Sequence, residues 1–163
     1  MIAIKYVENW IRDEFLSTKY HQDFAKRKLG VQSGGEFECD AVSDDGKIVC
    51  FISTSSSKTA GDKPGAGKLA KIRTDAFWAG SLSEKPLEIV FAFTDKSMVE
   101  LVEQEQRNGR FPKYFKAFPV PLPTDLKKKL AKLKRNAAAE VSKQKKLRIS
   151  MEEPKQEAQP IVG

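Results

Sequence analysis

The sequence predicts an α/β (α+β) fold in which helices flank a central mixed β-sheet. Three observations support this prediction. The N-terminal stretch has helical periodicity, and two apolar runs flank an Asp-Gly turn between Gly34 and Ser57. A third strand-like run lies between two further helical stretches, an order that implies parallel crossovers beside the hairpin. At 163 residues the chain is long enough for one domain with its own core.

Residues 3–19 are predicted to form an amphipathic helix. Its apolar side chains recur near helical spacing and are Val7, Trp10, Ile11 and Phe15. A second helical segment is predicted from His21 to Leu29, because Gly30 suits the position that follows a helix C-terminus. A short Gly-rich loop then leads into the hairpin.

The hairpin is the strongest local signal in the chain. With the Asp-Gly pair as a two-residue turn, Val42 faces Val49 and Asp40 faces Phe51, whereas a three-residue turn would shift this register by one. Strand alternation predicts one apolar core face, formed by Phe37, Cys39, Ala41, Ile48, Cys50 and Ile52. The opposite face is predicted to hold three acids, Glu36, Glu38 and Asp40. Its other residues are Val42, Val49, Phe51 and Ser53. This acidic face is either a solvated surface or part of a charged site, and both cysteines are expected to be buried free thiols.

A loop rich in Ser, Gly and Lys runs from Ser55 to Lys68 and leads into a helix predicted over Gly67–Trp78. The order of residues that defines a nucleotide-binding P-loop is absent. The N–H groups and dipole of the helix N-terminus favour phosphate, and a flexible surface loop is the equal alternative. The helix has a polar stripe that comprises Lys68, Lys71 and Asp75. An apolar stripe lies beside it and comprises Leu69, Ile72 and Ala76.

The remaining predicted elements complete the sheet. Leu87–Phe93 has the composition of a central strand buried on both faces. Asp95 is suited to cap a helix that continues to about residue 108. Tyr114–Val120 is predicted to be a short edge strand, because nearby prolines disfavour a central position.

Charge is concentrated near the C-terminus. Residues 127–148 hold ten Lys and Arg against one acid, whereas residues 1–126 are balanced. A continuous apolar seam of helical spacing runs through Leu126, Leu130, Leu133, Ala137 and Val141. We therefore predict a core over residues 1–123, a basic amphipathic helix over 124–148 and a disordered tail over 149–163.

The basic excess suits a polyanion, and we predict nucleic acid as the partner, DNA rather than RNA. The predicted contacts are Lys63, Lys71, Lys127, Lys128, Lys132, Lys134 and Arg135. A solvated helix packed on the body is the alternative, and a protein partner or homo-oligomer stays open. A membrane partner is disfavoured because the seam has no aromatic residue. The absence of a long apolar run or a secretory layout predicts a cytoplasmic protein, and the single His disfavours zinc sites and His-dependent hydrolases.

The region from Glu36 to Asp95 resembles the core of the PD-(D/E)XK, or restriction-endonuclease-like, nuclease superfamily. In that pattern an Asp on the second core strand and an acid-x-Lys on the third converge on a divalent metal. Asp40 fits the first position. The acid and Lys positions fall on Phe51 and Ser53, so this part of the motif is degenerate or has migrated.

The resemblance implies a Mg²⁺ site and a restriction-endonuclease-like core. Asp40 would hold the ion together with Glu38 or Glu36. In some relatives the lysine lies on the helix that follows, and the lysines that would neutralise phosphate here are Lys58, Lys63, Lys68 and Lys71. The first helix supplies an acid in some members, so Glu8 or Glu14 is a further candidate, although a solvated role is favoured for both.

Three hypotheses follow for the function. The first is a Mg²⁺-dependent phosphodiester hydrolase that acts on nucleic acid as an endonuclease. The second is an inactive relative that serves as a nucleic-acid-binding accessory. The third is a protein-interaction module whose basic helix docks a partner. The residues at Phe51 and Ser53 favour the second unless the acid and Lys have migrated.

Overall fold

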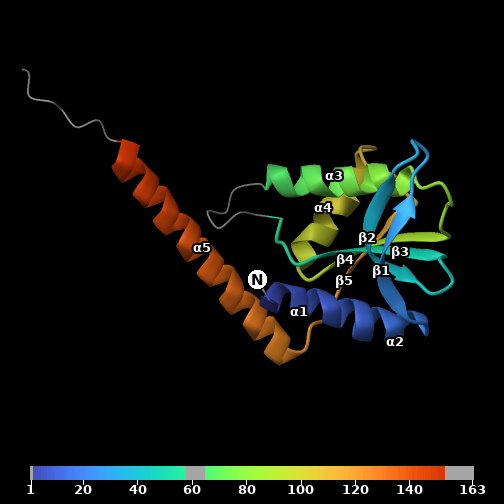
Figure 1. The fold of residues 1–163 in the computed structure, drawn as a ribbon, viewed down its shortest axis with the longest axis horizontal. Helices are drawn as coiled ribbons and strands as arrows, with labels where there is room; N and C mark the ends of the chain where they lie inside the picture. Colours follow the sequence, from blue (N-terminus) through green and yellow to red (C-terminus); the bar gives the residue numbers. More distant parts are fainter. Residues whose placement is uncertain (1, 58–64, 153–163) are drawn as a thin grey trace, which may run out of the picture.

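A computed structural model describes residues 2–57 and 65–152 of the chain. The fold is mixed α/β, with a five-stranded sheet flanked by helices (Figure 1). In chain order the elements are α1 (Ile2–Trp10), the π-helical segment η1 (Ile11–Leu16), α2 (Ser17–Tyr20), β1 (Phe24–Gly30), β2 (Glu36–Ser43), β3 (Ile48–Ser53), α3 (Ala66–Gly80), β4 (Glu88–Phe93), α4 (Lys96–Arg107), β5 (Lys116–Pro119) and α5 (Thr124–Glu152). Among the helices in these ranges, none is both long and apolar enough to cross a bilayer.

The strands lie in the order β1-β2-β3-β4-β5. The first three pair antiparallel, and β3–β4 and β4–β5 pair parallel. The predicted mixed sheet and the edge position of β5 are therefore confirmed. The strands predicted at Leu87–Phe93 and Tyr114–Val120 and the helix capped by Asp95 all form, with small differences at their ends.

The helix predicted from His21 to Leu29 is wrong, because this segment contains the edge strand β1. His21 takes a left-handed conformation (φ 55°) that ends α2. Phe24 is then the buried end of a strand that pairs with β2. The basic residues of β1 meet the acids of β2, as in the 2.9 Å ion pair between Lys26 and Glu38. Cross-strand pairing thus overrides the local helical pattern.

The hairpin has the predicted register at Val42, which pairs with Val49. Gly46 closes its turn with a positive φ of 72° and a 2.8 Å hydrogen bond from its N–H to the Ser43 carbonyl. The predicted single apolar face is wrong, however, because β2 contains a bulge. Arg27 pairs with Cys39 and Ala25 with Val42, so two residues of β2 lie opposite one of β1.

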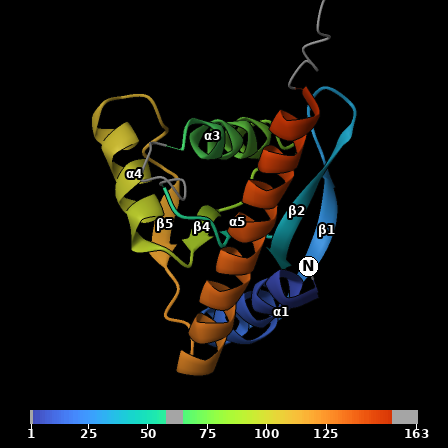
Figure 2. The ribbon, with the colours of Figure 1, turned by 90° about the vertical axis from the view of Figure 1, so that its left-hand side faces the viewer.

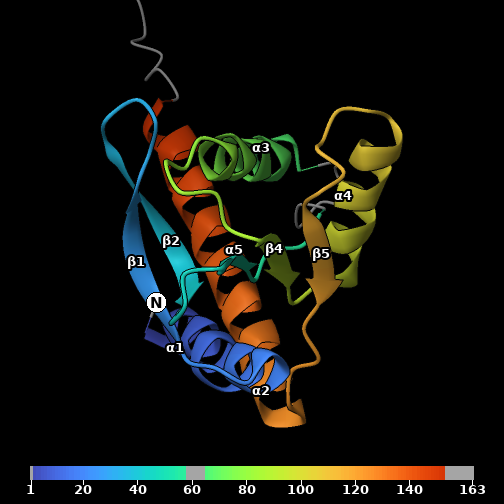
Figure 3. The ribbon, with the colours of Figure 1, turned by 90° about the vertical axis from the view of Figure 1, so that its right-hand side faces the viewer.

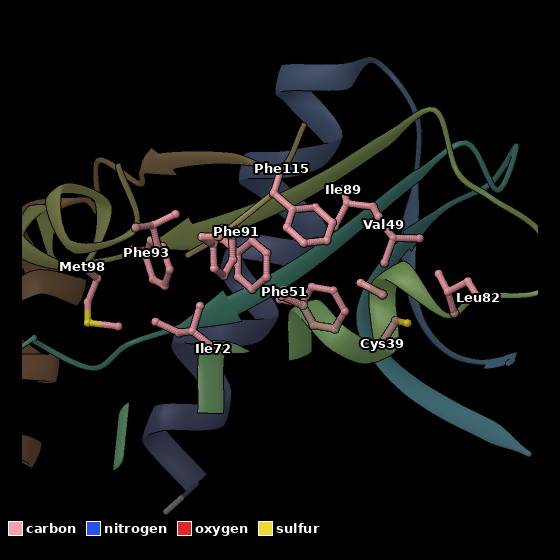
Figure 4. Packing of buried hydrophobic residues seen from close by; sticks show 14 of the residues in the cluster. Cys39, Val49, Phe51, Ile72, Leu82, Ile89, Phe91, Phe93, Met98 and Phe115 are labelled. Atoms are coloured by element: carbon pink, nitrogen blue, oxygen red, sulfur yellow. The ribbon is translucent and has the colours of Figure 1, made fainter. Parts of the chain in front are cut away.

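The bulge falls at Asp40 and Ala41 and reverses the alternation of side chains. Phe37 and Cys39 consequently lie on the face of Val42, Val49 and Phe51, and helices cover both faces of the sheet. Under α3 and α4 lies one apolar cluster, part of which is shown in Figure 4; its strand residues include Cys39, Val42, Val49, Phe51, Phe91 and Phe93. Under α1, η1 and α5 lies a second cluster; its strand residues include Phe24, Ala41, Ile48, Cys50, Ile52 and Val90. The two cysteines are buried free thiols, as predicted, but they lie on opposite faces.

Helix α5 begins on the body of the protein beside α1 (Figure 3) and then projects away from it (Figure 1). Leu126 and Leu130 are buried, and Lys129 Nζ lies 5.7 Å from the centre of the Tyr6 ring. Residues 139–152 are exposed. The helix continues to Glu152, so it includes four residues of the predicted tail, and residues 153–163 lie outside the described part of the chain.

Candidate functional site

Asp40 lies at the bulge, next to the end of the β2–β3 ladder. The last paired residues in that direction are Ala41 and Cys50. Beyond this pair the two strands are joined by the Asp40 side chain, whose Oδ2 accepts a 2.9 Å hydrogen bond from the Ile52 N–H. Arg12 on η1 donates from Nε to the Asp40 carbonyl at 2.8 Å. The side chain and main chain of Asp40 are thus both held by neighbouring elements.

Glu8 on α1 is a carboxylate whose pKa responds to the charge of Asp40. It is half-buried, and burial raises its pKa above the ordinary value. The negative charge of Asp40 raises the pKa of Glu8 further, while Lys26, Arg12 and Lys71 lower it. The two carboxylates are therefore close enough to repel one another.

Asp75 and Lys71 on α3 border the same region. Lys71 Nζ lies 3.1 Å from Asp75 Oδ2. Burial raises the pKa of Asp75, Lys71 lowers it, and the charge of Asp40 raises it again. Three carboxylates and a lysine from α1, β2 and α3 thus share one electrostatic neighbourhood.

Glu38 and Glu36 have other surroundings. Glu38 forms its ion pair with Lys26 at the exposed side of the β1–β2 pair, and Lys26 lowers the pKa of Glu38. Glu36 is exposed at the start of β2. Neither contributes to the pKa shifts of Glu8 or Asp75. Glu38 is thus linked to Asp40 through Lys26, whose pKa both carboxylates raise, whereas the pKa of Glu8 responds to Asp40 directly.

The positions that the resemblance reserves for an acid and a lysine differ in character. Phe51 is only 4% exposed and stacks on Phe91 with ring centres 5.3 Å apart. Ser53 ends β3 and lines a cavity. These two residues supply no charge to the site.

The cavity, of about 130 Å³, lies at the carboxyl ends of β3 and β4 beneath the first turns of α3. Its inner wall is apolar and comprises Phe51, Ile72, Phe91, Phe93 and Met98, side chains that Figure 4 shows side by side. Its rim is polar and comprises Ser53, Ser55, Lys68, Lys71 and Asp75. Two predicted lysines are thus brought to one rim, whereas Lys58 and Lys63 lie outside the described residues.

The predicted cations of α5 lie in its seated half, residues 124–138, which includes the buried Leu126 and Leu130. Lys127, Lys128, Lys132 and Arg135 are exposed. Lys134 is half-buried, and this burial lowers its pKa, while Asp95 raises it and Lys68 lowers it. Asp95 caps α4 by accepting a 2.9 Å hydrogen bond from the Ser97 N–H. Lys134 is therefore within electrostatic reach of the N-terminal ends of α3 and α4, and Figure 2 shows α5 rising from α1 past the sheet.

Glu8, Arg12 and Asp75 are site residues that sequence reasoning undervalued. Glu8 and Arg12 are spaced i, i+4 beside the buried Val7 and Ile11, which places them at the border of the core-facing side. That spacing was the available signal. Within residues 2–57 and 65–152, no cluster of three or more His, Cys, Asp or Glu side chains has the arrangement of a metal-binding group.

Comparison of the chain with protein-family models, with curated proteins and with solved structures found no match. The chemistry of the site is therefore inferred from its own residues. Paired carboxylates beside a lysine suit a hard cation and a phosphate group, and the basic helix nearby suits a polyanion.

Proposed function

We propose that this protein is a metal-dependent phosphodiester hydrolase that acts on nucleic acid through a restriction-endonuclease-like core. The observation that carries the proposal is the position of Asp40 where the β2–β3 ladder ends, with its carboxylate held by the Ile52 N–H, while the charges of Asp40 and Lys71 both act on the pKa of Glu8. The order of the elements supports it: a helix, three antiparallel strands, and a helical connection to a parallel strand. Lys71 stands on α3, the helix in which we expected a migrated lysine.

In this proposal Glu8 and Asp40 are the protein ligands of Mg²⁺. This ion prefers oxygen ligands and is often held by one or two carboxylates, with water completing its coordination. Burial and the charge of Asp40 raise the pKa of Glu8, and a bound cation would relieve this repulsion. When bound, the ion would supply an activated water and polarise the phosphate.

The chain's own residues hold the substrate and orient the charges. The Ile52 N–H and the Arg12 guanidinium fix Asp40 from two sides. Lys71 neutralises charge that develops on the phosphate, and Asp75 holds the Lys71 ammonium in place. The cations of α5 bind phosphates farther along the strand.

The proposal is tested by cleavage of labelled single-stranded and duplex DNA and of RNA with Mg²⁺ or Mn²⁺. Asp40→Asn keeps an acceptor for the Ile52 N–H and Glu8→Gln keeps the shape of the side chain, so both variants are expected to fold. Each should reduce cleavage at least about a hundredfold, because transition-state stabilisation by the metal is lost. Glu14→Gln is the matched control, because Glu14 is exposed on the same helical rod.

Metal binding gives a second, independent measurement. At a Mg²⁺ concentration of about 100 times Kd, binding stabilises the folded protein by about 2.7 kcal/mol. The thermal midpoint of the wild type and of Glu14→Gln should rise with Mg²⁺, and that of Asp40→Asn should not. Cleavage that survives Asp40→Asn would remove Asp40 from the metal site.

A nucleic-acid-binding accessory is the second candidate function. The buried Phe51 favours it, because an aromatic core residue occupies the place of a metal ligand. This candidate predicts salt-dependent binding of nucleic acid with neither metal binding nor cleavage. Those results together would replace the hydrolase proposal.

A further inference from the structure

The cavity beside the candidate carboxylates has an architecture that phosphate chemistry does not require. Its inner wall is closed by Phe51, Phe91 and Phe93, each no more than 4% exposed, and by Ile72 and Met98. The volume is about 130 Å³. An apolar cavity of about 150 Å³ accommodates a benzene ring. The space beside the site is therefore of the order needed for one six-membered ring and no more.

The polar groups of the cavity lie at its rim, on the end of β3 and on α3. Ser53 and Ser55 offer hydroxyls at the carboxyl end of β3, and Ser53 Oγ accepts a 3.3 Å hydrogen bond from the Ser55 N–H. A flat ring with apolar faces and a polar edge matches this division. Among the parts of a nucleic acid, a base has that character and a phosphate does not.

The position of Lys71 connects this cavity to the carboxylates. Lys71 lines the rim, pairs with Asp75, and acts electrostatically on Glu8. A nucleotide with its base in the cavity would place its phosphate beside Lys71. The base of a stacked duplex does not reach such a cavity, so the strand must present an unstacked base.

We infer that this cavity is a subsite for one pyrimidine base of single-stranded nucleic acid, held next to the candidate phosphate site. The inference rests on the proposed action on nucleic acid and adds the class of substrate. A single-ring pyrimidine is closer to this volume than a two-ring purine is.

Gly67 provides a direct test, because it lines the cavity and a Cβ added there meets no atom within 4 Å. Gly67→Leu adds a side chain at a residue that lines the cavity, keeps every charge, and improves helix propensity. Its thermal midpoint should equal or exceed that of the wild type. Ala66→Leu is the matched control: Ala66 is the exposed neighbour on α3 and does not line the cavity.

The probes are oligothymidylate, oligodeoxyadenylate and an abasic oligonucleotide of equal length, with binding measured by fluorescence anisotropy without added metal. The wild type should bind oligothymidylate about tenfold more tightly than the abasic strand, since an inserted base adds stacking energy. Gly67→Leu should lose this preference and keep the abasic affinity, and Ala66→Leu should keep both. Oligodeoxyadenylate should bind the wild type more weakly than oligothymidylate.

Failure of the inference and failure of the proposed function have different signatures. Equal affinity of the wild type for all three strands would overturn the base subsite and leave phosphate binding intact. A thymidylate preference that survives in a folded Gly67→Leu variant would also overturn it. No binding of any strand or of duplex DNA would overturn the proposed function together with the subsite. The wild-type comparison decides the question even if Gly67→Leu does not fold.

Discussion

Glu105 is a buried carboxylate that joins separate parts of the chain. Its Oε2 lies 2.7 Å from Arg73 Nη2 on α3 and 3.2 Å from Arg110 Nε beyond α4. Hydrogen bonds from these two arginines lower the pKa of Glu105 below its ordinary value. A carboxyl whose folded pKa is lowered stabilises the fold above the unfolded pKa, and this contribution is lost as the pH falls through the folded value.

We expect Glu105→Gln to lower the free energy of unfolding by about 2 kcal/mol at neutral pH, where charged hydrogen bonds are lost. The difference from wild type should shrink in acid, below the lowered pKa of the native carboxyl. Urea denaturation at neutral and acidic pH measures both values. Glu103→Gln, at an exposed position of the same helix, is the control. An equal loss at both pH values would show that the carboxylate charge is not the cause.

The two thiols report on the two faces of the sheet. Cys39 and Cys50 are fully buried. Burial raises the pKa of Cys39 to about 12, with the charge of Asp40 adding to it, and burial likewise raises the pKa of Cys50. Since the thiolate is the reactive form, neither should react with iodoacetamide in the native protein, and both should react after unfolding. Intact mass measurement counts the adducts, and modification of one native thiol would show that its face is open.

The sequence identified part of the candidate site at the level of residues. Asp40 was predictable because an acid inside an apolar strand is unusual, and Lys68 and Lys71 because they share a helical stripe. Glu8 was not separable from Glu14, since the π-helical segment after Trp10 changes the phase of the rod and hence the residues that face the sheet. Asp75 was undervalued because its pairing with Lys71 at i, i+4 resembles an ordinary solvated pair.

At the scale of elements, the hairpin register was predictable and the bulge in β2 was not. Turn residues and facing apolar positions set the register, as the Val42–Val49 pair shows. A bulge is hard to detect in this sequence, because helices cover both faces of the sheet and apolar residues therefore suit either face. Strand β1 was missed for a related reason: its exposed basic residues contain no alternating pattern, and only pairing with β2 defines it.

Helix α5 has two halves that differ in charge and position, which leads to a prediction for binding. Its half over residues 124–138 packs against α1 and holds exposed cations, whereas its half beyond residue 138 is exposed and projects from the body (Figure 1). We compare two variants that each lose four charges to Gln. One changes Lys127, Lys128, Lys132 and Arg135, and the other changes Lys143, Lys145, Lys146 and Arg148.

The seated-half variant should bind duplex DNA more weakly than the distal-half variant, because its charges lie on the part of α5 that packs against α1, the helix that carries Glu8. The slope of log affinity against log salt should fall by about 0.9 for each phosphate contact removed. Fluorescence anisotropy over a series of salt concentrations measures this slope. Equal losses in the two variants would mean that α5 binds as a uniform basic rod, and unchanged slopes in both would remove α5 from the interface.

At the scale of the whole molecule, α5 belongs to the fold and is more than an added basic segment. We predicted a core that ends at residue 123, from composition and charge. In the structure Leu130 lies in the same apolar cluster as Val7 and Ile11, so the first turns of α5 cover the α1 side of the sheet. The apolar seam was visible in the sequence, but the surface that it covers depends on the packing of elements more than a hundred residues apart in the chain.

This arrangement predicts different outcomes for two truncations. A chain that ends at Pro123 loses the buried side chains of Leu126 and Leu130, and deletion of a buried leucine side chain costs about 2–5 kcal/mol. Its thermal midpoint should fall by at least about 10 °C, since each kcal/mol corresponds to roughly 2–4 °C in a domain of this size. A chain that ends at Asn136 keeps both leucines and should melt close to the full-length protein, because the helix beyond residue 138 is exposed. Differential scanning calorimetry of the three chains measures these midpoints. If the Pro123 chain melted like the full-length protein, α5 would be an appendage after all, and loss of nucleic-acid binding in that shorter chain would then report on the charges of α5 alone.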